Sequence, residues 1–311
     1  MAGLLDIIFG YDCNLACTYC TITEEMRARA LPPQAIAAEL QRGRTHGFDA
    51  VSMTGGEPTT RPDLLPLVRR AAQLGYESIK VQSNGLVLGV GENAARLVEA
   101  GVTCVHISMH THERGAYEAM VRRAGTHAHM QRAFERLAAL DVELGADVIL
   151  ETDTLPRLPA AVDWLAERGV PAIDLWFVSL TDGNAARPES MPRMSDAVSI
   201  IAEARSRAEH HGMRMRSLHI PPCILGEHAD LAFNPALERV RVVSPDAVFD
   251  LADSVITPRQ HVPACEGCDF RARCGGLRPD YIEQYGDVEV ARARGVEPSV
   301  RGGARLPVVS G

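Results

Sequence analysis

The first two-thirds of the chain alternates short runs of β-branched or other apolar residues with segments in which apolar residues recur at helical spacing. This alternation is typical of repeated βα units built around a parallel sheet. The expected strands are Leu4–Gly10, Ala50–Thr54, Ser78–Gln82, Thr103–Met109, Ala146–Glu151 and Ala172–Val178.

Helices are expected between these strands. In Pro62–Leu74, apolar residues beginning at Leu64 recur at i, i+3, i+4 and i+7, and Gly75 follows where a helix C-terminal cap is expected. Six βα units are too few for a complete eight-stranded barrel, so we predict an α/β fold with a partial (β/α)6 barrel whose mouth lies at the strand C-terminal ends. The other expected helices are Pro33–Gln41, Glu92–Glu99, His127–Leu140, Pro159–Arg168 and Ser195–His211.

The pattern changes after about residue 212. Arg239–Val243 and Val248–Leu251 flank a Ser-Pro-Asp turn and indicate a β-hairpin, which a cysteine-rich loop follows. We therefore expect a barrel core over residues 1–212, a small domain with the hairpin and the cysteine-rich loop over 213–294, and a mobile tail over 295–311.

Composition narrows the class of protein. With 311 residues and 46% hydrophobic residues, the chain can bury one sizeable core and a small appended domain. A formal net charge of −8 argues against nucleic-acid binding, which needs clustered Lys and Arg. No apolar run approaches the roughly 20 residues of a membrane helix, and the N-terminus lacks a secretory signal, so we expect a cytoplasmic protein with no membrane or nucleic-acid partner.

The eight cysteines are clustered, which favours metal binding over disulfides in a chain without an export signal. Two groups of three stand near the two ends of the chain, and two further cysteines stand apart. The first group is Cys13, Cys17 and Cys20; the second is Cys265, Cys268 and Cys274; the isolated ones are Cys104 and Cys223.

The first group follows the first expected strand with C-x3-C-x2-C spacing. Three thiolates can hold a [4Fe–4S] cluster and leave one iron open for a ligand. From spacing alone, a zinc knuckle or three unrelated core cysteines remain alternatives. A second motif, Gly55-Gly56-Glu57-Pro58, ends the second strand; its glycines let a ligand approach the backbone and Glu57 can receive an ammonium group, although an ordinary strand-to-helix turn has the same composition.

Together, the two motifs resemble the radical S-adenosylmethionine (SAM) superfamily over roughly residues 4–211, and Tyr19 before the third cysteine fits as well. The resemblance implies that Cys13, Cys17 and Cys20 hold a [4Fe–4S] cluster whose open iron chelates SAM. A donor such as flavodoxin or ferredoxin would supply an electron, and SAM would yield methionine and a 5′-deoxyadenosyl radical. The residues that the resemblance places at SAM are Tyr19, Gly55, Gly56, Glu57, Ser83, Asn84 and Ser108. The fifth strand departs from the family because it lacks an Arg or Asn near its end.

The second group, Cys265-x2-Cys268-x5-Cys274, supplies four thiolates when Cys223 is added. Four thiolates can close a second [4Fe–4S] cluster or hold a zinc ion. The region resembles the auxiliary-cluster domains of the SPASM and twitch types. Because Arg278 stands where a full SPASM domain has a further cysteine, one auxiliary cluster is expected, acting as an electron relay.

Other residues near the expected barrel mouth have both a structural and a functional interpretation. Cys104 is either a small core residue or a thiol that donates a hydrogen atom to a substrate radical. His106, His110 and His112 are either structural or in contact with substrate. Four acids near strand ends suit a cationic substrate such as an amino sugar, but a solvated surface explains them nearly as well: Glu151, Asp153, Asp174 and Asp182.

The leading hypothesis is an enzyme that abstracts a hydrogen atom from an unactivated carbon of a natural product, in an oxidation or an epimerisation. The first alternative is a maturase of a ribosomally made peptide, although the first strand begins at Leu4 and leaves no room for a leader-recognition domain. The second is a non-catalytic zinc-binding protein, which the intact motifs disfavour. A methyltransferase is also open, but no cobalamin-binding domain is found.

Overall fold

The computed structural model describes residues 3–233, 238–254 and 259–299. Within them, one sheet has the strand order β7-β6-β5-β4-β3-β2-β1-β8-β9. All neighbouring strands are parallel except β8 and β9. The strands are β1 Gly3–Ile8, β2 Ala50–Thr54, β3 Ser78–Ser83, β4 Cys104–Ser108, β5 Glu143–Leu150, β6 Ala172–Phe177, β7 Arg214–Leu218, β8 Arg239–Val243 and β9 Val248–Asp250.

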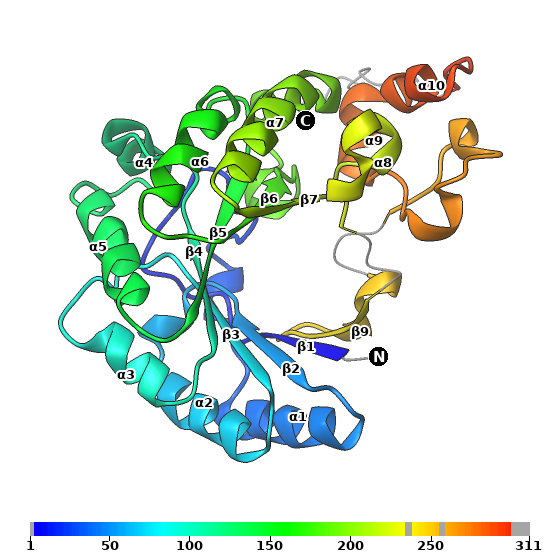
Figure 1. The fold of residues 1–311 in the computed structure, drawn as a ribbon. Helices are drawn as coiled ribbons and strands as arrows, with labels where there is room; N and C mark the ends of the chain where they lie inside the picture. Colours follow the sequence, from blue (N-terminus) through cyan, green and yellow to red (C-terminus); the bar gives the residue numbers. More distant parts are fainter. Residues whose placement is uncertain (1–2, 234–237, 255–258, 300–311) are drawn as a thin grey trace, which may run out of the picture.

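The sheet curves without closing, and helices α1 to α7 cover its outer face (Figure 1). This is the expected α/β fold with a partial barrel. The helices of the barrel are α1 Pro33–Thr45, α2 Leu64–Gln73, α3 Asn93–Glu99, α4 Arg114–Met120, α5 His127–Ala138, α6 Leu158–Ala166 and α7 Met194–His210. Helices α8 Pro222–Leu225, α9 Pro279–Tyr285 and α10 Val288–Arg294 follow.

The helical periodicity identifies the buried faces correctly. In α2 the buried residues are Leu64, Leu67, Val68 and Ala71, which form one stripe because 3.6 residues make a turn. Strand β4 is buried at four of its five positions, as expected for a parallel strand covered on both faces.

The sheet extends beyond the six expected strands. An additional strand, β7, pairs with β6, and the expected hairpin, confirmed as β8–β9, pairs through β8 with β1. The sheet is therefore larger than the six expected strands, because the chain returns to add strands at both edges. The division at residue 212 into two domains stays a prediction, and it falls between α7 and β7.

The tail predicted to be mobile begins at Gly295. Of this segment, residues 295–299 are described, and Ser299 donates its backbone N–H and its hydroxyl to the Asp287 carboxylate at 3.1 and 2.7 Å. Residues 300–311 lie outside the described residues. Among the described residues, no helix combines the length and the apolar character needed to cross a bilayer.

Candidate functional site

The loop after β1 brings its three cysteines to one cavity of about 180 Å³ at the carboxyl ends of the strands. Every residue that the SAM resemblance placed there lines the same cavity. They come from four segments: Cys13, Cys17, Tyr19 and Cys20; Gly55, Gly56 and Glu57; Ser83 and Asn84; and Ser108. The donor set fits an iron–sulfur cluster because three thiols face a space bordered by exposed glycine backbone.

Burial governs the protonation of these thiols. It raises the pKa of Cys13 to about 11 and that of Cys17 to about 12, and it raises the pKa of Cys20 as well. Without a metal the three side chains are therefore neutral at pH 7. A bound metal must displace these protons, so its affinity increases with pH.

Three arginines that the sequence analysis missed hold the cysteine loop in shape. Arg27 donates to the carbonyl oxygens of Cys13 and Leu15 at 2.8 and 2.7 Å. Arg123 donates to Asn14 O at 3.0 Å, and Arg187 donates to Thr18 O at 2.8 Å. Their side chains satisfy loop carbonyls that no strand or helix pairs. Arg123 and Arg187 are more than a hundred residues from the loop, and no sequence motif marks them.

The glycine motif after β2 lies directly against the beginning of the cysteine loop. Gly56 N donates to Gly10 O at 2.8 Å, and Glu57 N donates to Asp12 O at 2.9 Å. A Cβ atom at Gly56 would lie 2.0 Å from Asp12 O. Only glycine allows this approach, which explains why the motif is needed even before a ligand is considered.

Glu57 is buried between the loop after β2 and the end of β3. Its carboxylate is 2% exposed and accepts hydrogen bonds from both Thr59 donors, from Ser83 Oγ at 2.9 Å and from Asn84 N at 2.7 Å. Three of these donors reach Oε1 and Asn84 N reaches Oε2, so the carboxylate fastens the end of β3 to the loop after β2 and Oε2 keeps a further lone pair. The carbonyl oxygens of Gly55 and Gly56 accept no hydrogen bond from a described residue, so they are available as acceptors beside Oε2.

The three candidate histidines lie in different settings. His110 accepts from Ile149 N at its Nδ1 (3.0 Å), so Nε2 carries the hydrogen and donates to Tyr19 Oη at 2.6 Å. Burial lowers the pKa of His110 to about 4, and its ring lines a second cavity of about 440 Å³. His106 is buried in an ion pair with Asp147, and neither it nor His112 lines the two cavities next to the cysteine loop.

Cys104 is the first residue of β4, whereas Ser108 at the other end of the strand lines both cavities. The thiol is therefore at the end of β4 away from the cysteine loop. Its role as a hydrogen donor stays a prediction, and this placement does not favour it.

The four acids proposed for a cationic substrate are scattered. Only Asp182 lines the cavity beside the cysteine loop. Asp174 is paired with Arg216 at 2.6 Å, and Asp153 is exposed. Burial raises the pKa of Glu151 to about 7.

A buried polar network that the sequence analysis missed lies inside the barrel, on neighbouring strands. His106 Nδ1 lies 3.1 Å from Asp147 Oδ1 and 3.8 Å from Asp174 Oδ2. Gln82 and Trp176 also donate to Asp147, at 2.8 and 3.1 Å. Asp147, Gln82 and Trp176 line the larger cavity, so this network forms part of its wall.

The network predicts a pH-dependent stability. Burial alone would lower the pKa of His106, but the hydrogen bond to Asp147 outweighs it and raises the pKa to about 9. An unfolded histidine titrates near 6.5, so the stabilisation is complete below pH 6.5 and is lost as pH rises to 9. We expect the free energy of unfolding of the unmutated chain to fall by up to about 3 kcal/mol over this range because of His106.

Urea unfolding at pH 6 and pH 9 measures this effect against His106→Gln, which cannot titrate. The variant should be much less stable than the unmutated chain at pH 6, and the difference should shrink at pH 9. An equal difference at both pH values would show that His106 is not protonated in the folded chain.

At the other end of the chain, Cys223 in α8 meets Cys265, Cys268 and Cys274 around one small cavity. The structure thus brings together the four cysteines that the sequence analysis grouped, although Cys223 stands about forty residues from the others. Burial raises the pKa of Cys223 to about 12, and the neighbouring thiols add to this effect. Both a [4Fe–4S] cluster and a zinc ion accept four cysteines.

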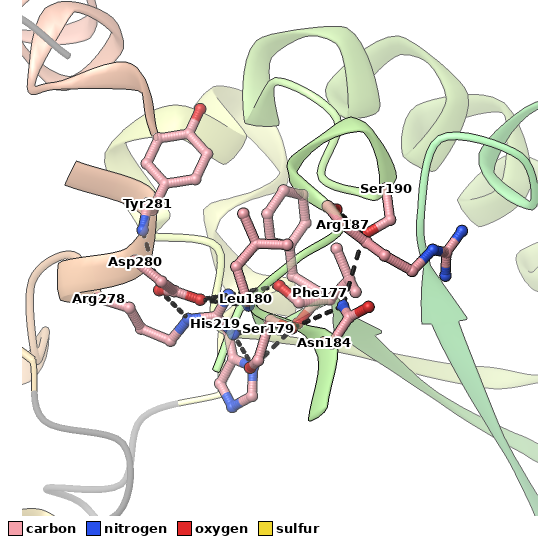
Figure 2. Close-up of polar contacts among 11 residues, drawn as sticks. Phe177, Ser179, Leu180, Asn184, Arg187, Ser190, His219, Arg278, Asp280 and Tyr281 are labelled. Carbon is pink, nitrogen blue, oxygen red and sulfur yellow. Dashed lines mark hydrogen bonds and ion pairs between the residues drawn. The ribbon is translucent and has the colours of Figure 1, made fainter. Parts of the chain in front are cut away.

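Arg278, four residues after Cys274, fastens this region to the barrel (Figure 2). Its side chain is 3% exposed, pairs with Asp280 at 3.0 Å and donates to the carbonyl oxygens of Phe177 and Val178 after β6. Asp280 in turn accepts from Leu180 N at 2.9 Å. The segment after β6 also reaches the first cysteine loop, where Gly183 N donates to Thr21 O at 2.8 Å.

Residues 7–165, just over half of the chain, match the radical SAM superfamily. The probable GTP 3',8-cyclase of Methanopyrus kandleri is 28% identical over 82% of this chain and 73% of its own length. The alignments with two further probable GTP 3',8-cyclases span 54% and 37% of those proteins.

Two solved structures resemble the fold. Streptococcus suis SuiB bound to S-adenosylmethionine gives a TM-score of 0.66 at 12% identity, over 94% of this chain and 66% of that one. The enzyme anSMEcpe with bound AdoMet and a peptide gives a TM-score of 0.67 at 14% identity, over 94% of this chain and 96% of that one. At such identities the likeness concerns the fold alone.

Proposed function

Because the chain belongs to the radical SAM superfamily, we propose that it is an enzyme that cleaves SAM reductively and removes a hydrogen atom from a carbon of a bound natural product. The observation that carries the proposal is the convergence of Cys13, Cys17 and Cys20 with the glycine motif on one cavity. Family membership implies a [4Fe–4S] cluster and SAM. When bound, the cluster supplies the electron that splits SAM into methionine and a 5′-deoxyadenosyl radical, which takes the hydrogen atom.

The residues of this chain position the reactants. Cys13, Cys17 and Cys20 would hold the cluster, and Gly55, Gly56 and Glu57 would receive the ammonium group of SAM. Glu57 also keeps Ser83 and Asn84 in place through two hydrogen bonds. Tyr19 is hydrogen-bonded to His110 and lines both cavities.

The larger cavity beside the SAM site would hold the substrate. It shares Tyr19, Gly55, Gln82 and Ser108 with the smaller cavity, so a substrate there lies next to bound SAM. Such direct adjacency lets a radical react with substrate instead of solvent. Oxidation is favoured over epimerisation, because the proposed hydrogen donor Cys104 does not line this cavity.

We further propose that Cys223, Cys265, Cys268 and Cys274 hold an auxiliary [4Fe–4S] cluster that relays electrons. A Cys268→Ala variant, reconstituted anaerobically with iron and sulfide, should contain about four irons per chain where the unmutated chain contains about eight. Elemental analysis measures both. About four irons in the unmutated chain together with one zinc would assign the site to zinc and contradict the auxiliary cluster.

A second candidate reaction is a cyclisation of GTP. It is favoured because the probable GTP 3',8-cyclase of Methanopyrus kandleri aligns with 82% of this chain. Release of 5′-deoxyadenosine separates the candidates, because a true substrate accelerates SAM cleavage above the basal rate. We expect acceleration by a natural product such as an amino sugar and none by GTP. Acceleration by GTP would overturn the natural-product assignment, and acceleration by a short peptide encoded beside this chain would favour the maturase.

A further inference from the structure

A third cavity, of about 400 Å³, lies between the sheet and the C-terminal cysteine segment. It shares Asp6, Ile8 and Trp176 with the cavity proposed for the substrate. The two spaces therefore adjoin, and a substrate that reacts beside SAM can extend toward the C-terminal segment. Arg259 and His219 line this third cavity, and neither residue has a role in the reaction proposed above.

Arg259 is a cation without a carboxylate partner. Among residues 3–233, 238–254 and 259–299, no acid lies within 4.0 Å of its guanidinium, although Asp6 and Asp253 line the same cavity. Burial and the nearby Arg278 lower its pKa, whereas Cys274 of the adjoining cysteine site acts in the opposite direction. A partly buried guanidinium without a paired carboxylate is costly, so its place in the cavity lining favours an anion from outside the chain.

The local backbone holds Arg259 in this position. Gln260 and Leu277 exchange two backbone hydrogen bonds, at 2.8 and 2.9 Å, which tie the segment to the cysteine loop. A Cβ atom at Gly275 would lie 2.9 Å from Arg259 Cδ. The glycine after Cys274 therefore leaves room for the arginine to enter the cavity.

His219 offers a second donor of fixed direction. His219 Nδ1 lies 2.9 Å from Arg278 Nη1 and 3.3 Å from the Phe177 carbonyl oxygen. The shorter contact is with a group that can only donate, and it favours the tautomer with the ring hydrogen on Nε2. Figure 2 shows that this second nitrogen points away from Arg278. Burial and Arg278 lower the pKa of His219 well below its usual value, so the ring is a neutral N–H donor. It also packs edge-on against Trp176, at a centroid distance of 5.7 Å.

We propose that Arg259 and His219 form a subsite for an anionic group of the substrate, a carboxylate or a phosphate. This inference rests on the proposed function, because it assigns one end of the same substrate. The guanidinium supplies charge and paired donors, and the imidazole Nε2–H adds a third donor. The carbon that reacts would then lie toward the Cys13 loop, at the other end of the joined cavities.

Calorimetric titration of the anaerobically reconstituted full chain tests the subsite, with inorganic phosphate and acetate as separate probes. One of them should bind, and the one that does identifies the anion. Arg259→Gln should weaken its binding by about tenfold or more, as expected for a lost charge-assisted hydrogen bond. Arg259→Lys should restore part of the affinity, and His219→Leu should cause a smaller loss.

The control is Arg69→Gln, which removes an exposed arginine of α2 and should leave binding unchanged. Equal affinities of the unmutated chain and Arg259→Gln, or no binding of either probe to the unmutated chain, would overturn the subsite. The titration needs no SAM cleavage. Absence of 5′-deoxyadenosine release by the unmutated chain is a separate result that counts against the proposed function.

Discussion

Cys17→Ala is expected to abolish SAM cleavage while leaving the C-terminal cysteines loaded. The thiol is one of three that line the 180 Å³ cavity, and two remaining thiols cannot hold a cubane that needs three protein ligands. The iron content should fall from about eight to about four per chain. Release of 5′-deoxyadenosine under dithionite should fall by about three orders of magnitude or more. Iron analysis and mass spectrometry of the nucleoside measure both effects.

The matched control for iron content is Cys104→Ala, because Cys104 is a buried cysteine outside both groups. It should keep all of the iron. If Cys17→Ala kept its iron and its nucleoside release, the cluster would not be held by the loop after β1.

Arg278→Met is expected to cause the largest loss of stability. The methionine fills a similar volume, but it leaves Asp280 buried without its cation and leaves His219 Nδ1 and the carbonyl oxygens of Phe177 and Val178 without their donor. Breaking a buried pair in this way costs about 3–5 kcal/mol. For a chain of this size the midpoint of thermal unfolding should fall by roughly 10 °C, which scanning calorimetry under anaerobic conditions measures.

Two variants distinguish the effect of losing the Arg278–Asp280 pair from the effect of removing any positive charge. Arg273→Met removes an exposed arginine five residues away and should change the midpoint little. Adding Asp280→Asn to Arg278→Met should recover part of the lost stability, because the unpaired carboxylate is removed while an acceptor for Leu180 N remains. A loss below about 1 kcal/mol in Arg278→Met would show that the pair does not fasten the C-terminal region to the barrel.

The sequence predicted those parts of the fold that depend on local periodicity. The six central strands and the stripe of α2 follow from apolar spacing, which burial on the sheet imposes. Strand β7 was missed because Arg214 and Arg216 alternate with apolar residues at the sheet edge, where one face meets solvent. The pairing of β1 with β8 joins residues more than two hundred positions apart, and no local pattern encodes such a contact.

The same limit applies to the site. The cysteines and the glycine motif were recognisable because ligand spacing and close backbone approach constrain consecutive residues. The roles of Arg27, Arg123 and Arg187 depend on carbonyl groups that only the folded loop presents. His106 and His110 lie four residues apart on one strand and its following loop, yet one is held in an ion pair and the other is kept neutral by burial. Their neighbours, which the sequence does not reveal, decide between these states.

The most direct test of the account is the product of SAM in the absence of substrate. The unmutated chain, reconstituted anaerobically and mixed with SAM and dithionite, should release 5′-deoxyadenosine and methionine in equal amounts, as quantified by mass spectrometry. Formation of S-adenosylhomocysteine without 5′-deoxyadenosine, or recovery of intact SAM from a preparation that contains zinc and no iron, would contradict the assignment of reductive SAM cleavage to the Cys13, Cys17 and Cys20 loop.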